Sequence, residues 1–281
     1  MKFGKINPGK LGFFGIFIGI ANLVPGISGG TVAIAFGIYD ELIASFKGLI
    51  SLDPEWQKYP KFLLPLLGGL FFSLFFFART IERLLEAHPI QMMMFFVGLI
   101  LGAVPYIYRR LEINEQTRME IKYALPLIIA FMVPIMLLIL RPAERAIISA
   151  PGLAEVPIIF AAGFISTATM IIPGISGTMV LMVIGMYPTY IAALSNLYGL
   201  VLLILGVGKL LGVIIAARLI HYLLRRFNRG TYFAILGLLL GSVVNVWPGL
   251  SGGIMTLLDF LILFAGFMIA YFFQAKQEQK S

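Results

Sequence analysis

The stretch NLVPGISGGTVAIAFGIYDELI, residues 22–43, breaks an apolar region with a proline followed by several glycines. In the second half of the chain, MIIPGISGTMVLMVIGMYPTYI, residues 170–191, does the same in nearly the same letters. Within a bilayer an unpaired backbone N–H or C=O costs several kcal/mol, so irregular backbone occurs there only inside protein or beside a water-filled cavity. The two PGISG motifs, residues 25–29 and 173–177, therefore call for a structural or functional reason.

The composition is typical of a membrane protein. Of the 281 residues, 60% are hydrophobic and 12% are charged, which is about half the charged fraction of a soluble domain. Apolar runs long enough to cross a bilayer recur along the chain. They predict an all-α polytopic membrane protein that forms one membrane domain over residues 1–281. Because the chain has no cysteine and only two histidines, neither a metal site nor a cofactor is expected.

The chain also contains an internal duplication. Residues 24–45 and 172–193 align with ten identities in 22 positions. The alignment resumes at a second offset with pairs that include Gly69/Gly208, Arg79/Arg218, Gly98/Gly237 and Gly102/Gly241. We therefore predict two repeats, residues 1–140 and 156–281, joined by a connecting loop at residues 141–155.

Each repeat is predicted to consist of a re-entrant helical hairpin, broken at PGISG, followed by three transmembrane helices. The first arm, residues 11–24, would be roughly 21 Å long against a hydrocarbon core of roughly 30 Å. Two tilted full spans are the alternative to a hairpin. The second segments of the two hairpins are expected over residues 31–50 and 178–194. The later spans are expected at 62–78, 91–108 and 123–140, and at 197–217, 230–247 and 254–273.

The distribution of positive charge predicts the orientation. An odd number of crossings in each repeat gives the second repeat the inverted topology. With the N-terminus inside, 16 of the 21 lysines and arginines lie on the inner side, four lie outside, and Lys209 lies within a span. The positive-inside rule then places both termini in the cytoplasm of a multi-pass protein of the cell (plasma or inner) membrane. This bias also explains the net charge of +8 without a nucleic-acid partner.

The PGISG motifs carry the chemistry of an anion site. A helix that starts just after each break exposes free N–H groups and the positive end of its dipole. Glycines let a ligand approach the backbone, and serine or threonine hydroxyls can cap the helix or donate a hydrogen bond. Because hairpins entering from opposite faces can meet near the midplane, we predict a shared phosphate site there. The predicted binding residues are Pro25, Gly26, Ser28, Gly29, Gly30, Thr31, Pro173, Gly174, Ser176, Gly177 and Thr178.

The structural alternative is a tight turn whose glycines serve helix packing, the role expected for Gly69, Gly98 and Gly102. A third motif of this kind, PGLSGG at residues 248–253, falls in a predicted outer loop, where a turn with a helix cap would explain it.

Several charged residues join the candidate list. Arg79 and Arg218 are related by the repeat and could receive an anionic headgroup at either face, or act as interfacial anchors. Lys209 lies deep in a span, which favours a cavity or an ion pair. Asp40, Glu41 and Asp259 are candidates for a carboxylate that couples transport to protons or another cation. The alternative for Asp40 and Glu41 is an ordinary charge in a loop, and the alternative for Asp259 is a position at the membrane interface.

On the two PGISG motifs and the G-x-Y that follows each, the chain resembles the polyprenyl-phosphate transporter (PopT) family of prokaryotic membrane proteins. The resemblance extends over nearly the whole chain. It implies re-entrant helices and a flippase that returns undecaprenyl phosphate from the outer to the cytoplasmic leaflet for reuse in envelope polymer synthesis. From this resemblance, binding roles are transferred to the present chain only at residues 25–31 and 173–178.

Two other functions are compatible with parts of the pattern. A transporter or channel for a small soluble anion would use the same helix termini. An intramembrane lipid phosphatase is disfavoured, because no histidine or acidic residue recurs beside both motifs to activate a serine. The expected partners are thus a polyprenyl-phosphate lipid, the bilayer and a coupling cation such as the proton; the sequence leaves open whether the protein is a homo-oligomer.

Overall fold

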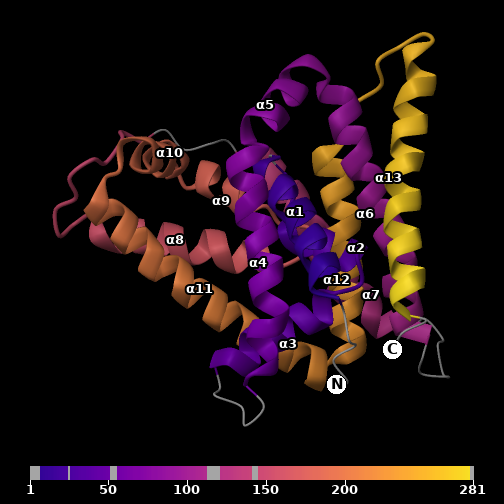
Figure 1. Cartoon of the computed structure of the whole chain (residues 1–281), viewed down its shortest axis with the longest axis horizontal. Helices are drawn as coiled ribbons and strands as arrows, with labels where there is room; N and C mark the ends of the chain where they lie inside the picture. The colour runs from indigo at the N-terminus through magenta and orange to yellow at the C-terminus, as the bar shows by residue number, and fades with distance from the viewer. Residues whose placement is uncertain (1–6, 25, 51–55, 113–120, 141–144, 279–281) are drawn as a thin grey trace.

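A computed structural model of the chain describes residues 7–24, 26–50, 56–112, 121–140 and 145–278. These residues form thirteen helices and the connections between them (Figure 1). The helices are α1 (Pro8–Leu23), α2 (Gly29–Ala35), α3 (Tyr39–Ile50), α4 (Lys58–Phe76), α5 (Ala78–Ala87), α6 (Pro89–Glu112), α7 (Ile121–Ile139), α8 (Val156–Ile171), α9 (Gly177–Val183), α10 (Tyr187–Asn196), α11 (Gly199–Arg226), α12 (Asn228–Val246) and α13 (Met255–Glu278).

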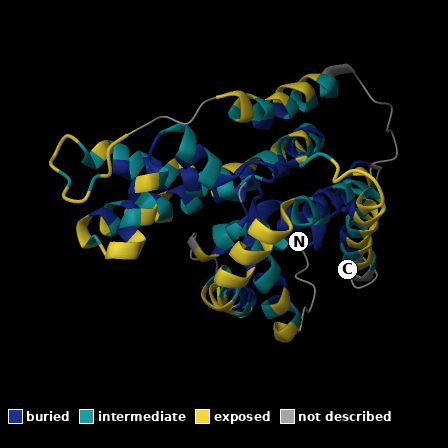
Figure 2. Ribbon diagram, turned by 90° about the horizontal axis from the view of Figure 1, so that it is seen from above, coloured by how far each residue is buried: buried dark blue, intermediate teal, exposed yellow. Residues whose placement is uncertain are grey.

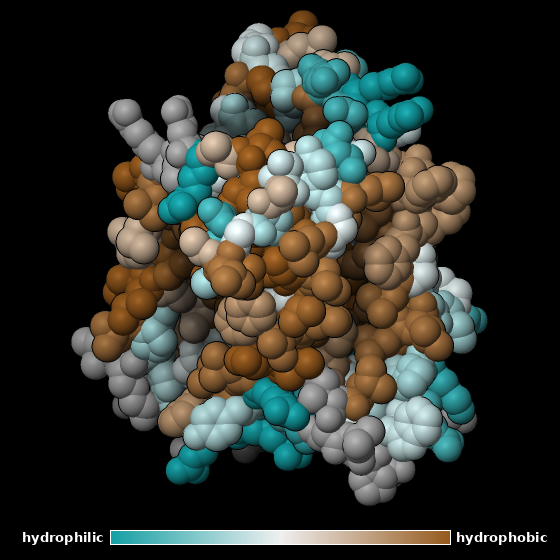
Figure 3. All heavy atoms as spheres, turned by 90° about the vertical axis from the view of Figure 1, so that its left-hand side faces the viewer, coloured by the Kyte–Doolittle hydropathy of each residue, from teal (hydrophilic) through white to brown (hydrophobic). Residues whose placement is uncertain are grey.

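The prediction of an all-helical membrane protein is confirmed. Five helices, α4, α6, α11, α12 and α13, are long and apolar enough to cross a membrane, and the bent pair α9–α10 would make a sixth if it is one span. The other predicted span, residues 123–140, corresponds to the shorter apolar helix α7. In the space-filling view, hydrophobic residues cover the middle of one face and hydrophilic residues gather towards its two ends (Figure 3).

The first arms of the two hairpins are short, as the sequence predicts. Helices α1 and α8 have 16 residues each, so each is roughly 24 Å long and falls short of a hydrocarbon core of roughly 30 Å. Proline at the first or second position of both helices suits a helix start, because those N–H groups have no partner within the helix.

The segment that follows each PGISG motif is broken once more, which was not foreseen from the sequence. A second break separates α2 from α3 and α9 from α10, and the latter pair is bent by 112°. Gly37 (φ 68°) and Gly185 (φ 75°) adopt left-handed backbone there, a conformation that glycine tolerates and most residues do not. The same hydrogen bond closes both turns, from Gly37 N–H to Ile34 and from Gly185 N–H to Met182. The G-x-Y sequence is therefore a turn that ends each short helix.

The helices pack in pairs, and glycines bring the pairs together. Helix α1 packs on α4, α8 on α11, α6 on α13 and α7 on α12. Gly69 lies directly against the carbonyl of Gly12, and Gly98 and Gly102 lie against carbonyls of α13, so that a side chain at these positions would collide with backbone. The predicted packing role of Gly69, Gly98 and Gly102 is thereby confirmed. In membranes such small residues allow the close contact that stabilises helix pairs.

The core surrounds the first hairpin. Every residue of α2 is buried, and the largest hydrophobic cluster joins residues of α1, α2 and α3 to α4, α6 and α12. Buried segments accordingly fill the middle of the molecule, whereas α10 and the connection before α8 lie towards its edge (Figure 2). Helix α5 lies at the opposite end of the molecule from α3 (Figure 1). Of the predicted connecting loop, residues 145–155 form no α-helix, and 141–144 lie outside the described residues.

Candidate functional site

The two PGISG motifs contact each other, although they lie more than 140 residues apart in the sequence. The Gly174 N–H donates to the Thr31 hydroxyl at 2.9 Å, and the Ser28 hydroxyl donates to the Ile172 carbonyl at 3.3 Å. A third bond at 3.4 Å runs from the Tyr39 hydroxyl to the Ile171 carbonyl. These bonds confirm the predicted meeting of the two motifs.

Gly30 is required at this contact by its surroundings. A Cβ at Gly30 would lie 2.5 Å from the carbonyl oxygen of Ile171 and 3.3 Å from the nitrogen of Pro173. Both of these are backbone atoms, which cannot rotate away as the end of a side chain can. Gly30 therefore sets how closely the two motifs approach.

In the first motif, the serine caps the helix that follows. The Ser28 hydroxyl oxygen accepts from the Thr31 N–H at 3.2 Å and pairs with the Thr31 hydroxyl at 3.1 Å. Both side chains are buried. Gly26 has the left-handed backbone (φ 87°) that the turn needs. Pro25, also predicted for this site, lies outside the described residues.

In the second motif the serine does not cap its helix. The Ser176 hydroxyl pairs instead with the Thr178 hydroxyl at 2.8 Å. In the described part of the chain, the N–H groups of Gly177, Thr178 and Met179 have no acceptor. Thr178 and Met179 are half-buried rather than buried. The start of α9 thus offers unpaired N–H groups and a hydroxyl at one place, which is what an anion binds.

One polar neighbour of the site was missed by sequence reasoning. The Asn22 side-chain nitrogen is buried and has no hydrogen-bond partner among the described residues. A Cβ at Gly29 would lie 3.1 Å from the Asn22 amide oxygen, so this side chain lies beside the first turn of α2. The repeat has Met170 at the corresponding position. An asparagine inside an apolar helix, without a counterpart in the repeat, was the signal available in the sequence.

Asp40 lies in a buried charged cluster next to the site. The Tyr232 hydroxyl donates to its carboxylate, 2.9 and 3.0 Å from the two oxygens, and the carboxylate pairs with the Arg110 guanidinium at 3.3 Å. Arg110 also donates to the Tyr106 hydroxyl. Asp40 is 5% exposed, so the alternative of a loop charge is wrong for this residue. The cluster joins α3, α6 and α12, and Arg110, Tyr106 and Tyr232 were not foreseen.

Glu41 differs from its neighbour because one of its carboxylate oxygens, Oε2, is buried without a hydrogen-bond partner. Helix α3 is not among the spanning helices, and burial, followed by the charge of Asp40, raises the pKa of Glu41 above its usual range. Glu41 therefore holds a proton more readily than an exposed glutamate does.

The remaining charged candidates lie apart from the motifs. Arg79 and Arg218 are exposed on α5 and α11. The Lys209 ammonium stands 4.0 Å from the centre of the Tyr190 ring. The hollow beside it is an open groove lined by residues of α11 alone, and the partner of the charge is an aromatic ring.

Asp259 binds to the third motif, PGLSGG at residues 248–253. It is fully buried within the protein. Its carboxylate accepts from the Ser251 N–H at 2.8 Å, the Ser251 hydroxyl at 3.0 Å and the Gln91 amide at 2.9 Å. These bonds hold the PGLSGG turn against α6 and α13. Among the described residues no group of three histidine or acidic side chains could hold a metal.

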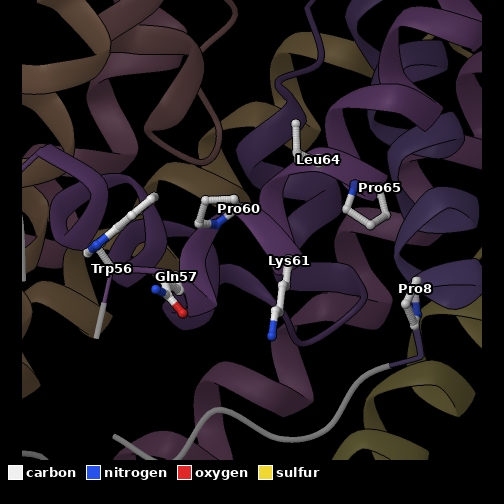
Figure 4. Close-up of a pocket in the computed structure, with 7 residues that line it drawn as sticks. All are labelled: Pro8, Trp56, Gln57, Pro60, Lys61, Leu64 and Pro65. Carbon is white, nitrogen blue, oxygen red and sulfur yellow. The ribbon is translucent and has the colours of Figure 1, made fainter. Parts of the chain in front are cut away.

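A cavity of about 540 Å³ lies near the beginnings of α1 and α4, well away from both motifs. Figure 4 shows its lining, with Lys61 as the charged member. Since no residue of either motif reaches it, this cavity plays no part in the candidate site.

Comparisons with known proteins agree with the resemblance seen in the sequence. Residues 18–260 match the family described as "Undecaprenyl phosphate translocase-like". A "Polyprenyl-phosphate transporter" of Staphylococcus aureus is 34% identical over 265 residues, which cover 91% of this chain and 92% of the relative. A protein of the same name from Vibrio cholerae is 34% identical over 245 residues, 83% of this chain and 76% of the relative. No solved structure matches. The chain therefore belongs to the undecaprenyl phosphate translocase-like family.

Proposed function

We propose that this protein is a flippase that moves polyprenyl phosphate, with undecaprenyl phosphate as the first candidate, from the outer to the cytoplasmic leaflet of the cell membrane for reuse in envelope polymer synthesis. The observation that carries the proposal is the contact between the two PGISG motifs at the unpaired start of α9. Family membership and the names of the two relatives support the choice of lipid.

The phosphate is held by backbone N–H groups at the start of α9 together with the Thr178 hydroxyl, and the unpaired Asn22 amide beside α2 is a further donor on the side of the first motif. Backbone donors suit a phosphate because they are fixed in direction and add no positive charge that would trap the anion. The polyprenyl chain stays in lipid along the outer surface of the helices. The large exposed side chains of α11, among them Leu203, Leu210 and Leu219, give that chain an apolar path.

The two halves act as inverted repeats, each contributing one motif to one site. The packing supports this interpretation, because α1 contacts α4 as α8 contacts α11, and α6 contacts α13 as α12 contacts α7. Rocking of one half against the other would then open the shared site to one leaflet at a time.

Inverted hairpins can be tested in a chain that has no native cysteine. Single cysteines at Gly9, exposed in the first turn of α1, and at Leu153, exposed before α8, should react with an impermeant reagent from opposite sides of the membrane. Labelling of both from the same side would contradict the inverted arrangement, and with it the placement of the two hairpins.

Inward movement of the anion needs a driving force. Carrying one negative charge against an inside-negative potential costs roughly 2.3 kcal/mol per 100 mV. We propose that a proton accompanies the phosphate, and that Glu41 is the first candidate to carry it, because its Oε2 is buried, unpaired and one residue from the Asp40 cluster. Consumption of the lipid on the cytoplasmic side is the alternative driving force.

The function is tested with purified protein in proteoliposomes that contain labelled undecaprenyl phosphate. We expect protein-dependent movement of the label between leaflets, together with binding that an uncharged prenol does not displace. Movement of inorganic phosphate instead of the lipid would favour the soluble-anion alternative. Release of phosphate from the lipid would identify a phosphatase.

A further inference from the structure

A second basic site lies outside the PGISG motifs, where α3 packs against the last turns of α11 (Figure 1). A cavity of about 500 Å³ opens there, lined by Lys47, Arg218, His221, Tyr222, Arg225 and Arg226. Four of the six lining residues are permanently cationic. None of these four has a carboxylate within ion-pair distance in the described part of the chain.

Because the three arginines are exposed, water screens much of the repulsion among the four cations. An anion bound among them would still contact four charges that have no carboxylate partner. The positive-inside rule explains why basic residues are frequent on one side of the membrane. It does not explain why one of them, Lys47, comes from the first half of the chain to face three arginines of the second half across a cavity. A bound anion would remove the remaining repulsion and would match the geometry of the arginine guanidinium groups.

The repeat provides an internal comparison. Residues 79–87 of α5 read RTIERLLEA and residues 218–226 of α11 read RLIHYLLRR, with Arg79 and Arg218 as the first letters. The stretch in α5 has two arginines and two glutamates, so its charges cancel. The stretch in α11 has three arginines and no acidic residue. One end of the molecule is therefore cationic where the equivalent end is neutral.

We propose that this basic cavity binds the phosphate monoester of the transported lipid after it leaves the PGISG motifs, and so forms a release station in the leaflet next to α3. The inference rests on the proposed function. An arginine-rich cavity prefers a dianionic monoester to the single charge of a glycerophospholipid diester. Exposed Leu219 and Tyr222 on the same helix provide apolar contact for the attached chain. The charge difference between α11 and α5 then favours retention of the lipid on the α3 side.

The experiment uses a single reporter cysteine, His221→Cys, in the otherwise cysteine-free chain. Purified protein in detergent is labelled with a maleimide in the presence of undecaprenyl phosphate, prenol, inorganic phosphate or phosphatidylglycerol. We expect undecaprenyl phosphate to slow the labelling at least tenfold, and the other three to have little effect. His88→Cys, at the end of α5, is the matched control and should label at the same rate with every addition.

The triple change Lys47→Gln, Arg225→Gln and Arg226→Gln on the reporter background should abolish the protection, because each lost charge-assisted hydrogen bond weakens binding about tenfold. The charge-conserving pair Arg225→Lys and Arg226→Lys should retain part of it. Equal protection in the triple variant would overturn the site. Equal protection by inorganic phosphate or phosphatidylglycerol would overturn its assignment to the lipid monoester.

Failure of this inference is distinguishable from failure of the proposed function. If the wild type transports undecaprenyl phosphate but the lipid never protects His221→Cys, the release station is wrong and the flippase stands. If the lipid is not transported at all, the proposed function is wrong.

Discussion

The two hairpins contain the same PGISG motif but place it in different surroundings. In the first, α2 is entirely buried, Ser28 caps the helix, and Thr31 accepts a bond from the second motif. In the second, Ser176 leaves the start of α9 uncapped, and Thr178 is half-buried. We infer that the first motif is the scaffold that holds the second, and that the second offers the donors that bind the phosphate. One copy of the motif alone would then not form the proposed site.

The asymmetry extends to the residues that follow each motif. The first hairpin continues into Asp40 and Glu41, and the second has Pro188 and Thr189 at the same positions. Asp40 is fixed by Arg110 and Tyr232, whereas the Thr189 hydroxyl accepts from the Ile148 N–H at 3.2 Å. The carboxylates that could bind a coupling proton therefore follow the first motif and not the second.

The largest effect is expected for Gly30→Ala, which would push the two motifs apart. The new Cβ would meet backbone of the second motif, and overpacking of this kind costs about 1–3 kcal/mol of stability. Transport should be lost with it. Gly68→Ala is the matched control, since a Cβ there meets nothing within 4 Å. A Gly30→Ala protein that transports at the wild-type rate would show that close contact of the motifs is dispensable.

Thr31→Val and Thr178→Val separate the scaffold role of the first motif from the binding role of the second. Thr31→Val leaves the buried Gly174 N–H without its acceptor, and such a loss costs about 1–3 kcal/mol, which a thermal unfolding measurement would detect. Thr178→Val should lower stability less and weaken binding of undecaprenyl phosphate more. The opposite ranking in both measurements would mean that the assignment of scaffold and binding hairpin is reversed.

Ser28→Ala and Ser176→Ala compare the start of α2 with the start of α9. Ser28 caps α2, so its removal should cost about 1 kcal/mol of stability. Ser176 accepts no backbone bond in its helix, so Ser176→Ala should have a smaller effect in the same denaturation assay. Equal losses of stability would show that the two motifs differ less than their hydrogen bonds indicate.

Glu41→Gln should change stability least, because the Glu41 Oε2 has no partner to lose. The raised pKa means that Glu41 is protonated up to a higher pH than an ordinary carboxyl and loses the proton as pH rises further. We expect the transport rate of the wild type to change with pH over that range, and the rate of Glu41→Gln to stay constant over the same range. The exposed Glu82→Gln on α5 is the control. A wild-type pH profile in Glu41→Gln would exclude Glu41 as the proton carrier.

Features that depend on local pattern were predictable from the sequence. Repeated PGISG letters predicted a break after α1 and after α8, and apolar run lengths predicted most of the later helices to within about five residues, although α11 extends nine residues beyond its predicted end. The packing glycines were predictable because a glycine within an apolar helix has few other roles. The meeting of the motifs was predicted from the repeat together with the distribution of positive charge.

Features that depend on distant partners were not predictable. The second break required knowledge that Gly37 and Gly185 adopt positive φ. Asp40 looked like a loop charge because Arg110 and Tyr232, its partners, lie 70 and 192 residues away. The partners of Asp259 were not foreseen for the same reason, since Gln91 reaches it from another helix. A single sequence carries no signal for such pairs.

The most direct test of the central claim, that the second motif holds the phosphate against the scaffold of the first, is the labelling rate of Thr178→Cys in the otherwise cysteine-free protein. Undecaprenyl phosphate should slow reaction of this cysteine with a maleimide, and uncharged prenol should not. Leu153→Cys, which is exposed before α8, should react at the same rate throughout. Unchanged labelling of Thr178→Cys at lipid concentrations that support transport would contradict the account.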